Sequence, residues 1–238
     1  MSRRRFFVDP PRAGLCELRG DDARHLTHVL RVEPGQKFEI SDNSSVYLAE
    51  VAEARRDRVV FRILEPIDSP PVLVHITLCA TLVKFDRFEW TVEKATELGV
   101  ERILPVESAR SEKGLLEASR KRSDRWQRIA RESAQQSRRA HRPEILPAVR
   151  VPAALATEAA FRYFLDESTA PPLLSLLPAA RTPADTVALF IGPEGGWTDS
   201  ERTQASAYGW TRASLGPTIL RAETAAVAAL SVIVNTWL

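Results

Sequence analysis

Two turns within the stretch Thr186–Leu230 decide the fold: Ile191-Gly192-Pro193-Glu194-Gly195-Gly196 and Leu215-Gly216-Pro217-Thr218-Ile219-Leu220-Arg221. Each turn follows a short apolar run. The first run, Thr186–Ile191, has the β-branched and aromatic content of a buried parallel strand, and the second, Arg212–Leu215, predicts another strand. Both runs end near glycines, which let bare backbone approach a ligand closely. We therefore expect the two turns to form one ligand-binding site.

Helices are predicted after both turns. Thr198 and Glu201 form the Ser/Thr-x-x-Glu pattern of a capping box, so a helix should begin just after Trp197. An alanine-rich segment, roughly residues 223–238, predicts the last helix. Strand, turn and helix, repeated in this way, are typical of an α/β fold, in which ligands bind at the carboxyl ends of parallel strands.

The two turns carry no phosphate-binding fingerprint. Neither G-x-G-x-x-G nor G-x-x-x-x-G-K-[ST] is present, and the carboxylate of Glu194 would repel a phosphate group. A ligand with hydroxyl groups, a base edge or a positive centre fits better. A purely structural alternative stays open, in which Glu194 and Glu223 are acidic residues of first helical turns, favoured there by the helix dipole.

The same residues carry a resemblance to a known family. Gly192-Pro193-Glu194-Gly195-Gly196, Leu215-Gly216 and Ile219-Leu220-Arg221-Ala222-Glu223-Thr224-Ala225 resemble, in order and spacing, the signature of the SPOUT methyltransferases with a deep trefoil knot. More narrowly, they resemble the family of ribosomal RNA small subunit methyltransferase E, which methylates N3 of a uridine in 16S rRNA. The resemblance implies a knotted parallel-sheet domain, S-adenosylmethionine as the methyl donor, and a homodimer.

The resemblance also implies roles for single residues. Arg221 would be the catalytic cation that stabilises the uracil anion, whereas a structural alternative pairs Arg221 with Glu223 or another carboxylate. The positive sulfonium of the donor would explain a carboxylate at Glu194. The cofactor-binding residues that the resemblance implies are Leu82, Glu167, Ile191, Gly192, Pro193, Glu194, Gly195, Gly196, Leu215, Gly216, Ile219, Leu220, Glu223 and Thr224.

Residues 1–68 predict a small β-rich domain. A strand is expected at Arg5–Val8, Asp21 can cap a helix that runs through Leu30, and alternating runs near residues 37–41, 46–53 and 58–64 outline a compact barrel.

Two stretches of this domain, Phe6–Asp9 and His25–Gly35, resemble the PUA-like RNA-binding domain of the same family. Asp42-Asn43-Ser44-Ser45 stands where that family tends to have a glycine-containing turn. The prolines of Ile67–Pro71 suit an extended linker, because proline cannot pair in a central strand.

Residues 72–238 form the expected SPOUT methyltransferase domain. The apolar run Val72–Cys79 fits a buried strand. Gly99 should end the helix predicted at Trp90–Leu98. Further elements are predicted at Trp90–Leu98 (helix), Arg102–Val106 (strand), Ala118–Arg139 (long helix) and Phe161–Leu165 (strand), with a proline-bounded connector at 171–181.

Basic residues are concentrated in one part of the chain. Residues 110–142 contain 11 Lys and Arg but 4 Asp and Glu, although the whole chain has a net charge of only +2. This asymmetry predicts a polyanion-binding face, with a solvated helix surface as the alternative. The predicted RNA-binding residues are Arg3, Arg4, Arg5, Lys84, Arg87, Arg125, Arg128, Arg138 and Arg139.

Composition bounds the compartment and the cofactors. Cys16 and Cys79 are far apart, and no metal-ligand spacing joins them to the four histidines, so we expect a reducing, cytoplasmic setting and no metal. Arg3-Arg4-Arg5 superficially resembles an export signal, but the apolar core that such a signal needs does not follow. No run reaches the roughly 20 apolar residues of a membrane span.

Several functions remain compatible with the sequence. Within the methyltransferase reading, the target is a 16S rRNA uridine, alone or in the small ribosomal subunit, or else a ribose 2′-hydroxyl or a tRNA. A second class is a non-catalytic rRNA-binding assembly factor, against which the intact glycines and Arg221 speak. A phosphate-dependent nucleotide enzyme has no support in the turns.

Overall fold

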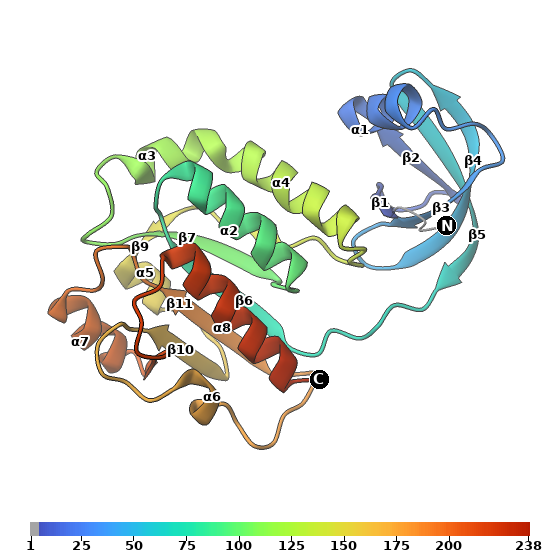
Figure 1. Cartoon of the computed structure of the whole chain (residues 1–238). Coiled ribbons are helices and arrows are strands. Elements are labelled where there is room, and N and C mark those ends of the chain that lie inside the picture. Colours follow the sequence, from blue (N-terminus) through green and yellow to red (C-terminus); the bar gives the residue numbers. More distant parts are fainter. Residues whose placement is uncertain (1–4) are drawn as a thin grey trace. The chain divides into compact units, whose positions relative to one another are not determined.

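The computed structural model describes residues 5–238, which fold into two units (Figure 1). Of the described residues, the first unit takes those up to Pro70 together with Ala134–Arg142, and the second takes Pro71–Ser133 and Pro143–Leu238. The sequence-based division placed all of residues 72–238 in one domain, whereas Ala134–Arg142 packs with the N-terminal unit. The predicted RNA contacts Arg3 and Arg4 lie outside the described residues.

The first unit is built on a curled five-stranded sheet of order β1-β3-β4-β5-β2. Its strands are β1 (Arg5–Phe7), β2 (Leu15–Arg19), β3 (Lys37–Ser41), β4 (Val46–Arg55) and β5 (Arg58–Ile67). β1 pairs with β3 in parallel, and the other pairs are antiparallel. Alternate side chains such as Ile40, Val51 and Phe61 are fully buried in its core, as the alternating runs predicted.

The helical segment of this unit differs from the prediction. It begins at Gly20, with Arg19 and not Asp21 at the N-cap position, and it consists of α1 (Gly20–Arg24) and a π-helical turn, η1 (His25–Val29). The cause is β2, which the sequence analysis missed. This strand runs directly into the helix, and Gly20 makes the change of direction at a φ of 69°.

The segment 134–142 supplies polar contacts to β3 and to the loop after it. The carboxylate of Glu39 accepts from Arg5 (2.9 Å) and from Arg138 (2.5 Å). The Ser41 hydroxyl donates to the carbonyl of Ala140 at 2.6 Å. In the loop, Asn43 takes a positive φ of 70°, which asparagine tolerates.

The second unit contains a parallel sheet of order β12-β10-β11-β6-β7-β8, with β9 also paired to β7. Its strands are β6 (His75–Thr81), β7 (Arg102–Glu107), β8 (Glu144–Ile145), β9 (Val149–Arg150), β10 (Phe161–Leu165), β11 (Thr186–Ile191) and β12 (Thr211–Ala213). The predicted α/β fold with a parallel sheet is therefore confirmed. The trefoil knot stays a prediction.

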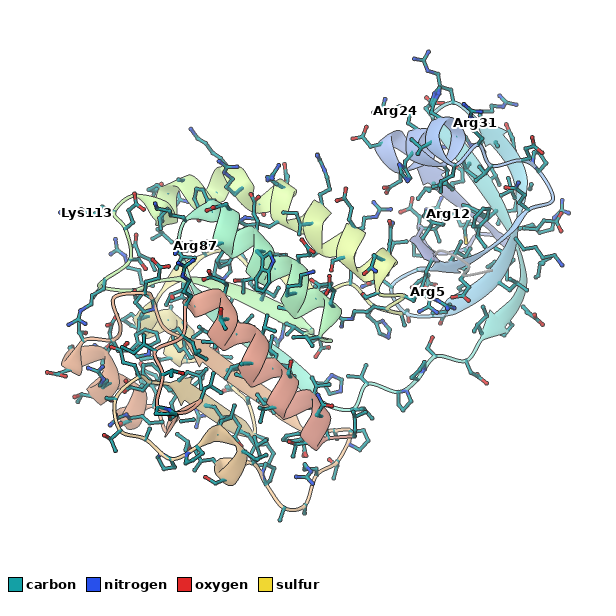
Figure 2. All side chains as sticks on the ribbon, in the orientation of Figure 1. Arg5, Arg12, Arg24, Arg31, Arg87 and Lys113 are labelled. Atoms are coloured by element: carbon teal, nitrogen blue, oxygen red, sulfur yellow. The ribbon has the colours of Figure 1, made fainter. Side chains whose placement is uncertain are left out.

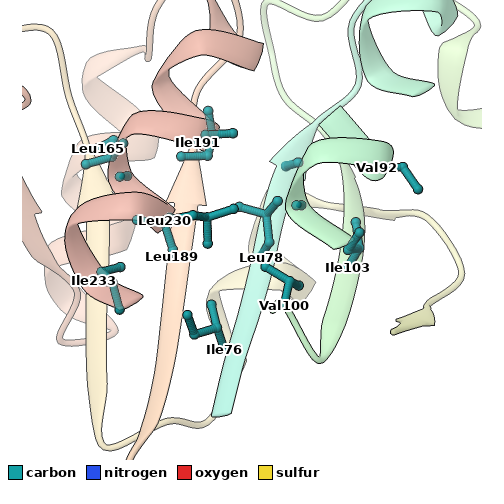
Figure 3. Close-up of a cluster of buried hydrophobic side chains, with 14 of the residues drawn as sticks. Ile76, Leu78, Val92, Val100, Ile103, Leu165, Leu189, Ile191, Leu230 and Ile233 are labelled. Atoms are coloured by element: carbon teal, nitrogen blue, oxygen red, sulfur yellow. The ribbon is translucent and has the colours of Figure 1, made fainter. Parts of the chain in front are cut away.

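Helices cover both faces of this sheet. They are α2 (Phe85–Glu97), α3 (Leu115–Ser119), the 3-10 turn η2 (Arg120–Arg122), α4 (Ser123–Gln136), α5 (Val151–Leu155), α6 (Leu173–Leu176), α7 (Asp199–Ala207) and α8 (Ala222–Thr236). One core, shown in part in Figure 3, joins α2 and α8 to strand residues such as Leu78 and Leu189. A second core on the other face joins Phe164 and Phe190 to residues of α5 and α7. Burial on both faces explains why these strands are continuously apolar.

Helix boundaries show where local signals failed. α2 begins at Phe85, before the predicted start at Trp90, and its N-cap, Lys84, makes no side-chain cap that the sequence could reveal. The long helix predicted at Ala118–Arg139 starts earlier, contains the η2 turn, and ends at Gln136 because Arg138 adopts a left-handed φ of 57°. The predicted capping box of Thr198 and Glu201 is present in α7.

Within residues 5–238, none of the helices combines the length and the apolar character that crossing a lipid bilayer requires.

Candidate active site

The candidate site lies where three neighbouring strands end. β12, β10 and β11 are adjacent and parallel, so the loops that follow them meet at one edge of the sheet. The Asp166 amide donates to the carbonyl of Ala213 at 3.0 Å, and the Trp197 indole N–H donates to the carbonyl of Leu165 at 2.7 Å. These two bonds tie the three strand ends together.

A pocket with an empty volume of about 580 Å³, open to solvent, occupies this edge. Its lining residues are Leu165, Asp166, Glu167, Ile191, Gly192, Pro193, Gly196, Trp197, Ala213, Ser214, Leu215, Gly216, Thr218, Ile219, Leu220, Ala222 and Ala225. The walls therefore come from both glycine-containing turns, the end of β10 and the first turn of α8.

Two glycines of the first turn are required by close packing. A Cβ on Gly192 would lie 2.8 Å from the indole nitrogen of Trp197, which is 1% exposed and stacks on Phe164. A Cβ on Gly196, whose φ is 68°, would lie 2.0 Å from a carboxylate oxygen of Glu167. A side chain at position 192 would therefore collide with the buried indole, whereas one at position 196 would displace the exposed Glu167 carboxylate and strain a left-handed backbone.

Asp166 is a pocket residue whose buried carboxylate binds two arginines. Its side chain is fully buried, and it accepts hydrogen bonds from Arg202 of α7 at 2.9 Å, from Arg212 of β12 at 3.0 Å and from the Ser168 amide at 3.1 Å. Burial alone would raise the pKa of Asp166, but the hydrogen bonds from Arg202 and Ser168 outweigh it, so the pKa of this carboxyl lies below its usual value.

Replacement of Asp166 by asparagine is expected to lower the free energy of unfolding by about 2–3 kcal/mol at pH 7, because two arginines lose their shared charge. The stabilisation by Asp166 is complete above the ordinary Asp pKa of about 3.9 and is lost as pH falls through the lowered native pKa. Urea unfolding of both proteins between pH 3 and pH 7 measures this difference, which should shrink on the acid side.

Asp199→Asn is the matched control. Asp199 also contacts Arg202, at 3.1 Å, but its side chain is fully exposed, so its loss should leave the stability close to that of the wild type. A difference of that small size for Asp166→Asn, or one that does not depend on pH, would contradict the role given to the buried carboxylate.

The pocket brings together nine of the predicted cofactor residues: Glu167, Ile191, Gly192, Pro193, Gly196, Leu215, Gly216, Ile219 and Leu220. Five others do not line it. Gly195, Glu223 and Thr224 lie in the flanking turn and helix. Leu82 is fully buried in the core, its amide bonded to the carbonyl of Val106, so its side chain is a packing group.

Glu194 is the fifth predicted residue that does not line the pocket. It forms an ion pair with Arg87 at the start of α2. The carboxylate in the glycine turn is thus balanced by an arginine of the chain, and the positively charged ligand expected from the sequence is not needed to explain it. The same ion pair engages Arg87, which was predicted to contact RNA.

Arg221 is exposed and lies between the lining residues Leu220 and Ala222 at the N-cap of α8. The structural alternative paired Arg221 with Glu223, yet among residues 5–238 the structure shows no ion pair of Arg221. One oxygen of Glu223 is buried without a hydrogen-bond partner.

Two important wall residues were not predicted. Asp166 directly follows the predicted strand 161–165, and an acidic residue at a strand end was the available signal. Trp197 follows Gly196, but its place in the pocket wall depends on its hydrogen bond to the carbonyl of Leu165, which is 32 residues away. No local pattern indicates that bond.

The predicted RNA-binding residues are scattered over both units (Figure 2 labels Arg5 and Arg87). Arg5 is a correction: it is 6% exposed and bound to Glu39, so a phosphate could reach it only by breaking that buried pair. Arg125 makes two bonds to Glu89, at 2.6 and 2.8 Å, and Arg138 is paired with Glu39. Lys84 and Arg128 are exposed, and Arg139 is half-buried.

No group of three or more His, Cys, Asp or Glu side chains in the described part of the chain is arranged to hold a metal ion.

The fold and the pocket are those of an RNA methyltransferase: residues 70–234 match the family described as RNA methyltransferase domain, and residues 18–64 match the one described as RNA methyltransferase PUA domain. Ribosomal RNA small subunit methyltransferase E of Mycobacterium bovis is 30% identical, over 96% of this chain and 90% of its own length. The chain belongs to the family of ribosomal RNA small subunit methyltransferase E.

Solved structures agree with this assignment. A ribosomal RNA small subunit methyltransferase E from Neisseria gonorrhoeae, bound to S-adenosyl methionine, is 30% identical, with a TM-score of 0.88 and coverage of 99% of this chain and 98% of its own. A putative methyltransferase from Legionella pneumophila, in complex with the cofactor SAM, is 26% identical, with a TM-score of 0.89 and the same coverage.

Proposed function

We propose that the protein transfers a methyl group from S-adenosylmethionine to N3 of a specific uridine in 16S ribosomal RNA. The observation that carries the proposal is the pocket at the ends of β10, β11 and β12, walled by both glycine-containing turns. Family membership supports it, as do the two solved relatives that contain this donor over closely similar folds.

The pocket residues fit an adenosyl group. In the described part of the chain, the backbone N–H and C=O groups of Leu215, Ile219 and Leu220 have no hydrogen-bond partner in the protein. Such groups match the donors and acceptors on the edge of a base, and they discriminate without side chains. Glu167, an acidic residue at the end of a parallel strand, suits the hydroxyl groups of a ribose. Apolar walls from Ala222 and Ala225 suit the ring faces.

When bound, S-adenosylmethionine supplies an electrophilic methyl group on a sulfonium. Methyl transfer is an in-line displacement, so the two turns must hold the donor in line with the accepting nitrogen. The N3 proton of the uracil passes to solvent water, and negative charge develops over the uracil oxygens. The bond from N3 to the methyl carbon then forms as the bond from that carbon to sulfur breaks, which leaves a neutral thioether. Arg221, exposed beside the pocket, is proposed to stabilise that negative charge with its guanidinium.

The substrate must present an unpaired base, because N3 lies on the pairing edge of uracil. A uridine in a loop, or one flipped out of a stem, meets this condition. Lys84 and Arg128, both exposed, and Arg125, Arg138 and Arg139 are proposed to contact phosphates. Arg87 is proposed to do so while paired with Glu194.

The N-terminal residues 1–68 serve as a PUA-like RNA-binding domain, and residues 72–238 as the knotted methyltransferase domain. The protein acts in the cytoplasm as a homodimer, whose second subunit completes the site.

Two measurements test the proposal. Isothermal titration should show heat on addition of S-adenosylmethionine, and labelled methyl should then appear on 16S rRNA or on small ribosomal subunits, with 3-methyluridine as the product found by nucleoside mass spectrometry. Binding without transfer to either RNA, or a methylated ribose, would overturn the uridine assignment. Absence of heat would leave an RNA-binding assembly factor.

A further inference from the structure

A short turn after β7 contacts the first glycine-containing turn, residues 191–196, from outside the pocket. Residues 191–196 are called the donor-binding turn below. The short turn, residues 108–111, is closed by its own serines: the Ser111 amide donates to the Ser108 carbonyl at 3.2 Å, and the two hydroxyls lie 2.9 Å apart. Ser108 is 6% exposed. The turn is therefore held in shape by its own hydrogen bonds. Its arginine, Arg110, does not line the pocket described above.

A buried carboxylate fixes this turn to α7. Glu201, 5% exposed, accepts from the Ala109 amide at 2.8 Å with one oxygen. With the other oxygen it accepts from the amide and hydroxyl of Thr198, at 2.9 and 2.8 Å, which completes the capping box of α7. One side chain thus ties the 108–111 turn to the end of the donor-binding turn.

Arg110 extends from this anchored position over Gly195. Its guanidinium donates to the Gly195 carbonyl at 2.6 Å, and a Cβ on Gly195 would lie 3.4 Å from the Cβ of Arg110. Arg110 and Gly195 are both exposed, and neither lines the pocket. The contact is therefore made on the outer side of the turn whose inner side carries Gly192, Pro193 and Gly196.

The geometry of the peptide bond transmits this contact inward. In a trans peptide the C=O and the following N–H point in opposite directions. When Arg110 holds the Gly195 carbonyl outward, the Gly196 N–H is directed to the carbonyl of Pro193, which it reaches at 2.9 Å. Rotation of this peptide would break both bonds and displace Gly196, a lining residue with a left-handed φ.

We propose that Arg110 is a positioning residue for the methyl donor: held by the Glu201-anchored turn, it fixes the Gly195–Gly196 peptide and so keeps the donor-binding turn in its binding conformation. The inference rests on the proposed function, because it takes S-adenosylmethionine as the ligand of that turn. Arg110 touches neither the donor nor the RNA base. It acts on binding of the donor, and not on the reacting atoms.

The test compares three variants of Arg110 with a matched control. Arg110→Met keeps the apolar stem over Gly195 and removes the donor group, Arg110→Ala removes both, and Arg110→Lys keeps the charge and one donor group. Lys113→Ala, in the same loop and labelled in Figure 2, removes one exposed charge without a contact to the turn. Thermal unfolding of each variant verifies that it is folded.

Titration with S-adenosylmethionine should give a Kd about tenfold higher for Arg110→Met and Arg110→Ala, since a charge-assisted bond is lost. Arg110→Lys should be intermediate, and Lys113→Ala should equal the wild type. In turnover assays the KM for the donor should rise, while the KM for RNA stays within about twofold.

Two results would overturn the inference while the proposed function stands: wild-type donor affinity in Arg110→Met, or a rise confined to the KM for RNA, which would make Arg110 an RNA contact. If the wild type itself fails to bind S-adenosylmethionine, the proposed function falls, and the role of Arg110 falls with it.

Discussion

Replacement of Gly196 by alanine is expected to weaken binding of S-adenosylmethionine by about 100-fold or more, which corresponds to about 2.7 kcal/mol. Two costs add. The added Cβ would lie 2.0 Å from Glu167, and the φ of 68° is a left-handed conformation that costs an L-residue roughly 1–2 kcal/mol. The exposed Glu167 carboxylate, which is assigned to the ribose hydroxyls, must then swing away, and the strained backbone lies at the wall of the pocket.

Gly209→Ala separates the two costs. Gly209 has a similar φ of 74°, but its nearest neighbour is the end of the flexible Arg162 side chain at 3.1 Å, which can shift. We expect the control to lose some stability and to keep its affinity for the donor. Titration calorimetry and thermal unfolding of both variants measure these effects. Equal donor affinity in Gly196→Ala and the wild type would show that the donor binds elsewhere.

Arg221→Ala is expected to lower kcat by about 10²–10³-fold, the usual effect of removing one donor group from a developing negative charge. Donor affinity should change by less than about threefold, because the donor is assigned to backbone groups and not to this side chain. Single-turnover methylation of 16S rRNA, together with calorimetric titration of the donor, separates the two quantities.

The pH dependence adds a second readout for Arg221. A guanidinium beside the uracil favours its deprotonated form, so its loss should move the rise of kcat with pH to higher pH. Arg221→Lys, which keeps a cation without the planar fork, should retain part of the rate. Unchanged turnover in Arg221→Ala would remove this residue from catalysis.

The parts of the fold that could be predicted carry their signals within a few residues. The strand Thr186–Ile191 was predicted with the bounds of β11, because an apolar run with turn residues after it is a local pattern. The capping box of Thr198 and Glu201 is local for the same reason. The start of α2 carries no side-chain cap at Lys84, and its position was missed.

The parts of the site that could not be predicted depend on residues distant in sequence. Asp166 meets Arg202 and Arg212, which are 36 and 46 residues away, only after β10 and β12 pair. Arg110 meets Gly195 across 85 residues. Nothing in the spacing of such residues reveals their contact. The glycines of both turns could be predicted, because glycine itself marks a position where backbone conformation or close packing excludes a side chain.

Residues Ala134–Arg142 pack with the N-terminal unit although the chain on both sides of them belongs to the other unit. This arrangement limits how the chain can be divided into fragments. A fragment ending at the proline linker would keep the buried carboxylate of Glu39 but lose Arg138, and Ser41 would lose its acceptor at Ala140. Recombination at a single boundary would therefore exchange an incomplete unit, whereas a transplant that includes residues 134–142 together with the N-terminal segment would preserve the ionic contacts of the curled sheet.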